Sequence, residues 1–160
     1  MRRETPGVRV LPMSDRAPGF VGKGIERVQR ETFLRDLPAC GGRFRYRSSG
    51  LSARPGTIVL FQYRARVIAM AAFVRDEKFK LPRRGHGGVL HFDADSIRTF
   101  EPVDVAGMRK AWPGFVGFGH VKQVLNASCY PAFRRRLKNV MSPAMRRAGG
   151  VTHPETPRSA

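Results

Sequence analysis

The chain has 160 residues and a formal net charge of +18, because 30 Lys and Arg residues outnumber 12 Asp and Glu residues. Its hydrophobic fraction of 41% excludes a wholly disordered chain and suffices for one modest core. The longest uncharged apolar stretches, residues 57–63 and 67–74, are shorter than the roughly 20 residues of a membrane-spanning helix. Two Cys residues are too few for the disulfide scaffold of a small secreted protein. No secretory signal is visible, so we expect a cytoplasmic protein.

The positive charge is the strongest functional signal. Of the 30 cationic residues, 24 are Arg, whose planar guanidinium matches phosphate oxygens and base edges. An excess of Arg also arises in chains from GC-rich genomes, and acidic proteins or membrane surfaces are alternative partners. A charge of this size on a small chain nevertheless favours nucleic acid, DNA or RNA, over a membrane as the partner.

The first part of the chain predicts one helix and one basic strand. Residues 1–20 carry three Pro and little periodicity, so they predict a poorly structured segment with a short strand at 8–11. Apolar residues at helical spacing predict a helix over residues 25–37, closed by Pro38. Basic and aromatic residues alternate over residues 43–47, which predicts a strand with Phe44 and Tyr46 on one face.

The central part predicts a hairpin followed by a loop. Residues 57–63 are rich in β-branched and aromatic side chains, which favours a strand buried on both faces. Residues 67–74 predict its antiparallel partner. Residues 75–88 are polar and basic, and we interpret them as a long loop of the kind that often binds a ligand.

The last part predicts three short strands and two helices. The strands are expected at residues 89–92, 97–100 and 121–125. Asp104 is expected to cap a helix that runs to Trp112, and Ser128 is the candidate cap of a helix that runs to Leu137. The whole pattern indicates an α+β fold, with one domain at residues 21–140 and a flexible basic tail at 141–160.

The order of these elements resembles that of the PUA-like superfamily, in particular its EVE and YTH domains. The likeness is carried by Arg43–Ser49, by the Pro55–Tyr63 turn and strand, and by Val67–Val74. Phe100–Asp104 and Val121–Asn126 resemble the later strands of these domains, so the likeness covers roughly residues 24–139. The resemblance implies a curved mixed β-sheet or partial barrel flanked by short helices. It also implies a reader of nucleic acids that holds an extruded, modified base, with a separate nuclease or effector protein as a possible partner.

Base extrusion requires a stacking surface and polar groups that read the base edge. Aromatic side chains contribute about 1–3 kcal/mol per stacked base. Tyr46, Tyr63 and Trp112 are our stacking candidates because they neighbour polar or loop residues. The resemblance places Arg47, Ser48, Ser49 and Gln62 at pocket positions, where their donors and acceptors suit a base edge.

Phosphate contacts would position the nucleic acid without specifying its sequence. The candidates are cations in the predicted hairpin turn, the predicted loop and the last helix: Arg64, Arg66, Lys78, Lys80, Arg83, Arg84, Arg134, Arg135 and Lys138. Residues 134–136 are three consecutive Arg that span most of a helical turn, so at least one of them is expected to face away from the nucleic acid.

Two other functions fit the sequence. One is a general RNA-binding or ribosome-associated protein, which would bind without preference for a modified base. The other is a metal-dependent nuclease, because Asp76 and Lys78 form the acid-x-Lys half of a restriction-type nuclease motif. No phosphate-binding Gly-rich loop followed by Lys and Ser or Thr is present. We expect a binding domain without catalytic residues, metal or cofactor of its own.

Overall fold

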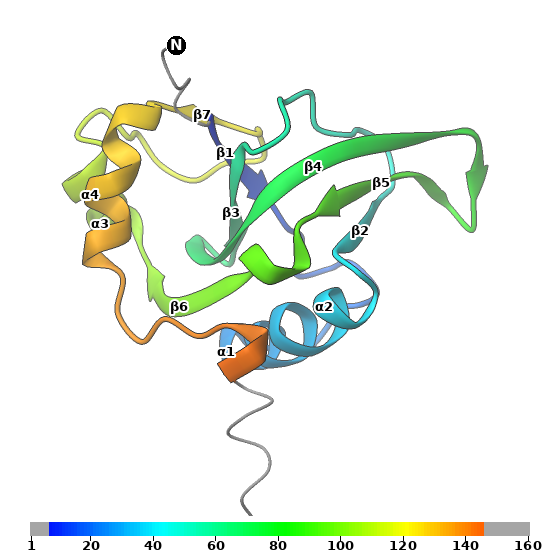
Figure 1. The fold of residues 1–160 in the computed structure, drawn as a ribbon, viewed down its shortest axis with the longest axis horizontal. Helices are drawn as coiled ribbons and strands as arrows, with labels where there is room; N and C mark the ends of the chain where they lie inside the picture. Colours follow the sequence, from blue (N-terminus) through cyan, green and yellow to red (C-terminus); the bar gives the residue numbers. More distant parts are fainter. Residues whose placement is uncertain (1–6, 146–160) are drawn as a thin grey trace, which may run out of the picture.

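The computed structural model describes residues 7–145, and a mixed, open sheet of seven strands runs through them (Figure 1). The strand order is β2-β5-β4-β3-β1-β7, and β6 also pairs with β4. The strands are β1 (Val8–Pro12), β2 (Arg43–Tyr46), β3 (Ile58–Tyr63), β4 (Arg66–Arg83), β5 (His86–Phe92), β6 (Arg98–Val103) and β7 (Val124–Leu125). The predicted α+β class is compatible with this architecture.

Strand β4 connects the two parts of the sheet. Its first part, residues 66–72, lies between β3 and β6, whereas residues 73–83 pair with β5. The predicted hairpin of residues 57–63 and 67–74 is confirmed, and its turn is formed by Arg64 and Ala65. Strand β3 is buried on both faces, as its composition predicts: Phe61 belongs to one core cluster and Leu60 to the other.

The prediction of a loop over residues 75–88 is wrong. These residues continue β4 and begin β5, and they form a two-stranded ribbon that projects from the body (Figure 1). The turn is Arg84-Gly85, and both residues have positive φ, as a tight hairpin requires. Most of the outer ribbon is exposed to solvent, so its residues show no apolar alternation from which a strand could be recognised.

The short strand predicted at residues 8–11 is confirmed as β1. It lies inside the sheet, parallel to β3 and antiparallel to β7. Val8 and Val10 are fully buried. Near the other end, Met141 exchanges backbone hydrogen bonds with Thr99, so the predicted tail begins with ordered contacts. Residues 146–160 of that tail lie outside the described residues.

Short helices cover both faces of the sheet. The predicted helix at 25–37 is observed as the consecutive segments α1 (Ile25–Val28), η1 (Gln29–Asp36) and α2 (Leu37–Ala39). On the other face lie α3 (Val105–Ala111) and α4 (Tyr130–Arg136). None of the helices within residues 7–145 has the length and apolar character needed to cross a lipid bilayer.

The helix caps agree with the sequence at one position and differ at another. Asp104 caps α3 as predicted, since its Oδ1 accepts a hydrogen bond of 2.9 Å from the Gly107 N–H. Ser128 does not cap the last helix, because it lies within η3 (Ala127–Cys129) and donates its own N–H to Asn126 Oδ1. Two Asx-type turns of this kind, at Asn126 and at Asp93 before η2 (Ala94–Ser96), start the 3₁₀ segments.

Candidate nucleic-acid interface

A hollow of about 610 Å³ opens between the end of β1 and the end of β2. We call it the β1–β2 hollow. One wall is formed by the chain after β1, including Met13 and Phe20, and the facing wall by residues 44–49. His86, His120 and Lys122 complete the lining. Four residues predicted to contact a base are therefore brought together here: Tyr46, Arg47, Ser48 and Ser49.

A second hollow, of about 760 Å³, lies on the other side of the same segment. It is lined by residues 48–53 and by one side of β4, including Phe73, Asp76 and Lys78. Tyr46, Ser48 and Ser49 line both hollows. The chain at residues 46–49 thus forms a partition, and its conformation determines the shape of both spaces.

Tyr46 is fixed in this partition by Asp76. The phenol donates a hydrogen bond of 2.6 Å to Asp76 Oδ1, and Asp76 Oδ2 accepts one of 3.1 Å from the Leu51 N–H. Burial and this hydrogen bond raise the pKa of Tyr46 to about 12. Tyr46 is therefore neutral at physiological pH, and Asp76 links β4 to the start of the partition and to Leu51 just beyond its end.

Lys122 holds the partition from the opposite side. Its ammonium donates to the Ser49 carbonyl at 2.9 Å, the Ser49 hydroxyl at 2.7 Å and the Gly50 carbonyl at 2.8 Å. Burial lowers the pKa of Lys122, and the nearby Arg9 guanidinium lowers it further. The sequence analysis missed Lys122, because a lone Lys in a predicted strand carries no sign of a partner some 70 residues away.

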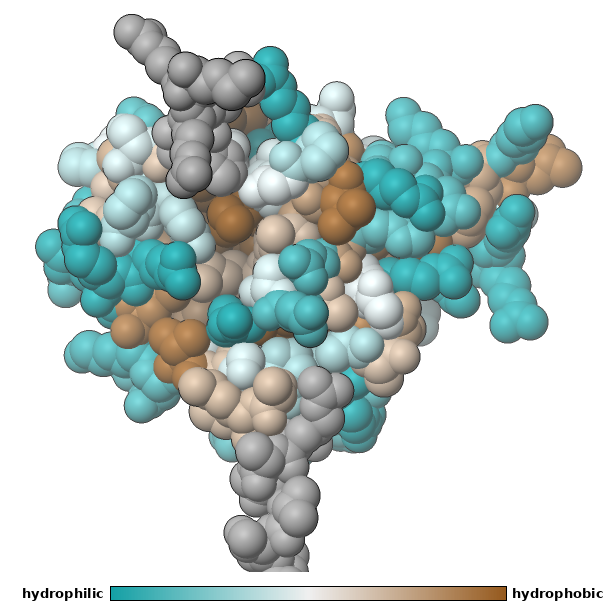
Figure 2. Space-filling model, viewed as in Figure 1, coloured by the Kyte–Doolittle hydropathy of each residue, from teal (hydrophilic) through white to brown (hydrophobic). Residues whose placement is uncertain are grey.

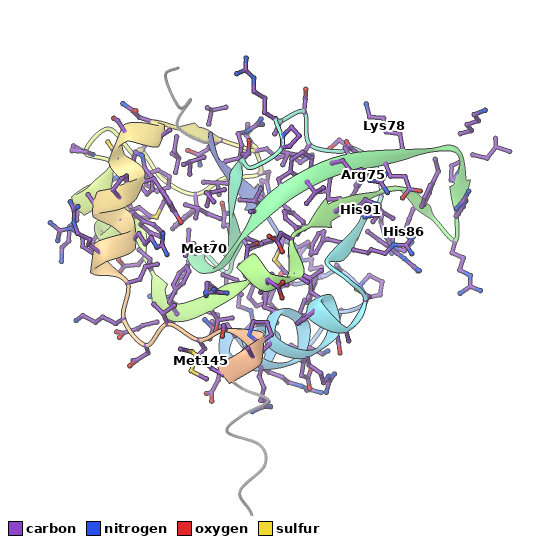
Figure 3. All side chains as sticks on the ribbon, viewed as in Figure 1. Met70, Arg75, Lys78, His86, His91 and Met145 are labelled. Carbon is purple, nitrogen blue, oxygen red and sulfur yellow. The ribbon has the colours of Figure 1, made fainter. Side chains whose placement is uncertain are left out.

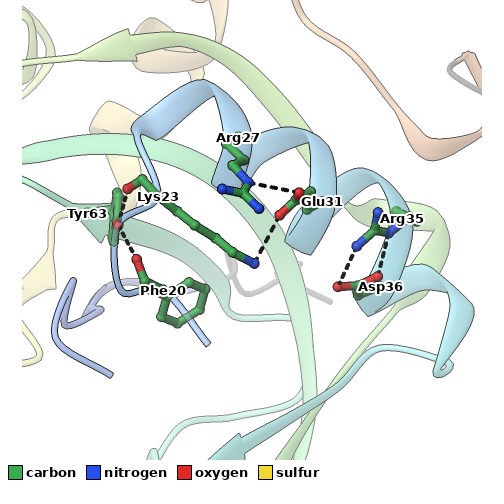
Figure 4. A network of polar contacts seen from close by, with 7 residues as sticks. All are labelled: Phe20, Lys23, Arg27, Glu31, Arg35, Asp36 and Tyr63. Atoms are coloured by element: carbon green, nitrogen blue, oxygen red, sulfur yellow. Dashed lines mark hydrogen bonds and ion pairs between the residues drawn. The ribbon is translucent and has the colours of Figure 1, made fainter. Parts of the chain in front are cut away.

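Three predicted base-contacting residues do not line the β1–β2 hollow. Tyr63 is fully buried, and its hydroxyl donates to the Lys23 and Phe20 carbonyls at 2.6 and 3.3 Å (Figure 4). Trp112 is also buried, and its indole N–H donates to the Asn126 carbonyl. Gln62 donates its amide to the Gly119 carbonyl. The structure gives no support to the stacking role predicted for Tyr63 and Trp112, because both side chains are buried in the core clusters.

Most of the predicted phosphate-binding cations lie in one of two cationic groups. Lys78, Lys80, Arg83 and Arg84 lie on the projecting ribbon, along which Figure 3 shows Arg75, Lys78 and His86. A separate group lines a hollow of about 650 Å³ between β6, α3 and α4: Arg66, Lys110, Arg135, Arg136 and Lys138, together with Glu101 and Asp104.

Two of the predicted phosphate-binding residues stand outside these groups. Arg64 pairs with Asp15 at 3.4 Å and lies over the Tyr63 ring. Arg134 does not line the hollow between β6, α3 and α4, whereas Arg135 and Arg136 do. One of the three consecutive Arg is therefore not part of this cationic group.

The acid of the acid-x-Lys pair has a structural role in this fold. Both carboxylate oxygens of Asp76 accept hydrogen bonds, from Tyr46 and from Leu51, and Lys78 is exposed on the ribbon. Across residues 7–145, no group of three or more His, Cys, Asp or Glu side chains is placed to hold a metal ion. The arrangement therefore gives no support to the nuclease alternative.

Comparison of the chain with protein-family models, with curated proteins and with solved structures found no match.

Proposed function

We propose that this chain is a nucleic-acid-binding module that holds an extruded, modified base in the β1–β2 hollow. The observation that carries the proposal is the gathering of Tyr46, Arg47, Ser48 and Ser49 around one hollow in a chain of net charge +18. Its volume of about 610 Å³ falls within the range of about 300–1,000 Å³ that small-molecule pockets occupy.

The lining has the two properties that a nucleobase requires. Phe20, Phe44 and Leu90 supply apolar surface for the faces of the heterocycle. Phe44 packs against Phe61 and Phe92, with ring centroids 5.6 and 6.4 Å away, so its position is set by the core. Hydroxyl and guanidinium groups at residues 47–49 supply donors and acceptors for the polar edge.

The arrangement of the strands supports a proposal about the type of fold. We propose that the sheet is a PUA-like partial barrel, supported by the way β4 joins β3 and β6 at one end and β5 at the other. Such a module recognises a base and leaves any strand cleavage to a separate protein. Asp76 then acts as a positioning residue, because it holds Tyr46 without lining the β1–β2 hollow, whereas Lys122 both holds Ser49 and lines that hollow.

The test is a binding screen with labelled oligonucleotides. Duplex and single-stranded DNA and RNA are compared with and without 5-methylcytosine, 5-hydroxymethylcytosine or N6-methyladenine, each at two salt concentrations. We expect one modification to tighten binding by about tenfold or more, which is the size of a good base-edge contact. Equal affinity for all modified and unmodified strands overturns the proposal and leaves general RNA or DNA binding.

Two variants that each remove one positive charge distinguish recognition of the modified base from electrostatic attraction to the phosphates. Arg47→Ala changes the hollow and is expected to remove the preference for the modified base. Arg134→Ala removes the same charge from α4, away from the β1–β2 hollow, and is expected to leave the preference for the modified base unchanged. Loss of the preference in Arg134→Ala but not in Arg47→Ala would place the reading site elsewhere.

A further inference from the structure

The ribbon of residues 75–88 is the most prominent projection of the molecule (Figure 1). We call it the arm. It borders the β1–β2 hollow, because His86, the first residue of β5, lines that hollow. The arm is fixed at its root by two side-chain contacts: Tyr46 donates to Asp76 at 2.6 Å, and His91 Nε2 lies 2.8 Å from Glu77 Oε2.

The exposed charge of the arm is positive. Asp76 and Glu77 are its two acidic residues, and both are occupied by the contacts at its root. The hydrogen bond from His91 keeps the pKa of Glu77 below its usual value. Beyond Glu77 the arm carries no acid and four cations: Lys78, Lys80, Arg83 and Arg84.

The outer end of the arm is apolar as well as cationic. Leu81 is 78% exposed, and Figure 2 shows hydrophobic surface at the far end of an otherwise hydrophilic arm. The Arg83 guanidinium lies 4.5 Å from the centre of the Phe79 ring. The strand pairing is irregular between Lys78 and Arg83, where residues 79–82 of β4 stand opposite Gly87 alone of β5.

We propose that the arm enters the major groove of duplex DNA, with Leu81 against the thymine methyl groups on its floor. The major groove of B-form DNA is about 12 Å wide and admits a two-stranded β-ribbon. Phosphates on both sides of the groove complement the four cations, and its thymine methyl groups offer an apolar contact. The major groove of A-form RNA is too deep and narrow for such an element.

This inference rests on the proposed function only because it takes nucleic acid as the partner. It specifies that the nucleic acid is double-stranded and that it is DNA, and it does not require a modified base. A cationic strand edge that merely keeps the arm soluble would need no exposed Leu at its end.

The test compares three duplexes of the same sequence and about 20 base pairs: DNA, DNA with every thymine replaced by uracil, and RNA. Uracil removes the methyl group and little else. We expect the wild-type protein to bind DNA at least about tenfold more tightly than RNA. Uracil should weaken binding about fourfold, the effect of one buried methyl group.

Leu81→Ala should bind thymine and uracil duplexes equally, and Val116→Ala is the control, because Val116 is 87% exposed at a distant loop. Lys80→Ala should make the slope of the logarithm of the binding constant against the logarithm of salt concentration less steep by about one. Equal or tighter binding of duplex RNA overturns the proposal, as does an unchanged thymine preference in Leu81→Ala.

The two proposals fail separately. If no modified base is preferred but the arm variants behave as expected, the arm proposal stands and the β1–β2 hollow is not a base reader. If modified single strands bind tightly and duplex DNA does not, the arm proposal is overturned alone.

Discussion

Tyr46 reaches Asp76 across an intervening strand. Tyr46 ends β2 and Asp76 lies on β4, and both strands pair with β5 but not with each other. The Tyr46 ring crosses over Gly88 of β5, its register partner, before the phenol donates to Asp76. The side chains of two non-adjacent strands therefore close the partition between the hollows.

Tyr46→Phe is expected to lower the free energy of unfolding by about 1–2 kcal/mol. The substitution removes a hydrogen bond to a carboxylate and leaves Asp76 Oδ1 without that donor. Urea denaturation measures the change. Tyr130→Phe is the control, because its hydroxyl contacts only Met70 Sδ at 3.6 Å among the contacts described. Equal stability of Tyr46→Phe and the wild type would show that the contact does not stabilise the fold.

Gly88→Ala tests the crossing of Tyr46 over β5. A Cβ at Gly88 would overlap the Tyr46 hydroxyl and lie 2.5 Å from the Glu77 carbonyl oxygen. We expect destabilisation of about 1–3 kcal/mol, the usual cost of overpacking, together with disturbed binding at the β1–β2 hollow. Gly114→Ala is the matched control, since a Cβ there meets nothing within 4 Å. Thermal unfolding measures the stability of both variants. A similar loss of stability in Gly88→Ala and Gly114→Ala would contradict the expected overlap at Gly88.

Buried strands were predictable and exposed ones were not. Residues 57–63 bury both faces of β3, so their composition alone indicates a strand. The arm has few buried positions. Its β4 residues form a strand because they pair with β5, and this pairing leaves no pattern in the sequence of β4. Strand β1 pairs in parallel with residues some 50 positions later, and a single sequence shows no such partner.

The candidate site was predictable only where its residues are consecutive. Residues 46–49 are consecutive, so they stay together in any fold, and all four line the β1–β2 hollow. Tyr63 was assigned from its polar neighbours, although β alternation places it on the same buried face as Phe61. The roles of Asp76 and Lys122 depend on partners far along the chain, which only the three-dimensional structure reveals.

Ala65→Gly is expected to stabilise the protein by about 0.5–1 kcal/mol. Arg64 and Ala65 form the β3–β4 turn with φ of 48° and 57°, a conformation that costs a side-chain-bearing residue about 1–2 kcal/mol. Glycine avoids that cost but loses about 0.4–1 kcal/mol through the greater freedom of the unfolded chain. Urea denaturation measures the gain. Ala106→Gly, within α3, should instead destabilise by about 1 kcal/mol, and a loss in both variants would contradict strain in the turn.

Glu31 makes the stability of the first helix depend on pH. Its carboxylate accepts contacts of 2.9 Å from Lys23 and from Arg27, and the hydrogen bond from Lys23 contributes most to lowering its pKa to about 2 (Figure 4). Because the pKa in the folded state is below that of the unfolded chain, these contacts stabilise the protein above pH 4.5 and the stabilisation disappears as the pH falls toward 2.

The melting temperatures of the wild type and Glu31→Gln measure this dependence between about pH 7 and pH 2. The wild type should melt higher near neutral pH, and the difference should shrink as the pH falls through the interval between the two pKa values, because a protonated Glu31 resembles Gln. Asp36→Asn is the control, since Asp36 pairs with Arg35 at an exposed position and surface pairs of this kind contribute little. A constant difference between Glu31→Gln and the wild type at every pH would mean that Glu31 stabilises the helix by packing rather than by its charge.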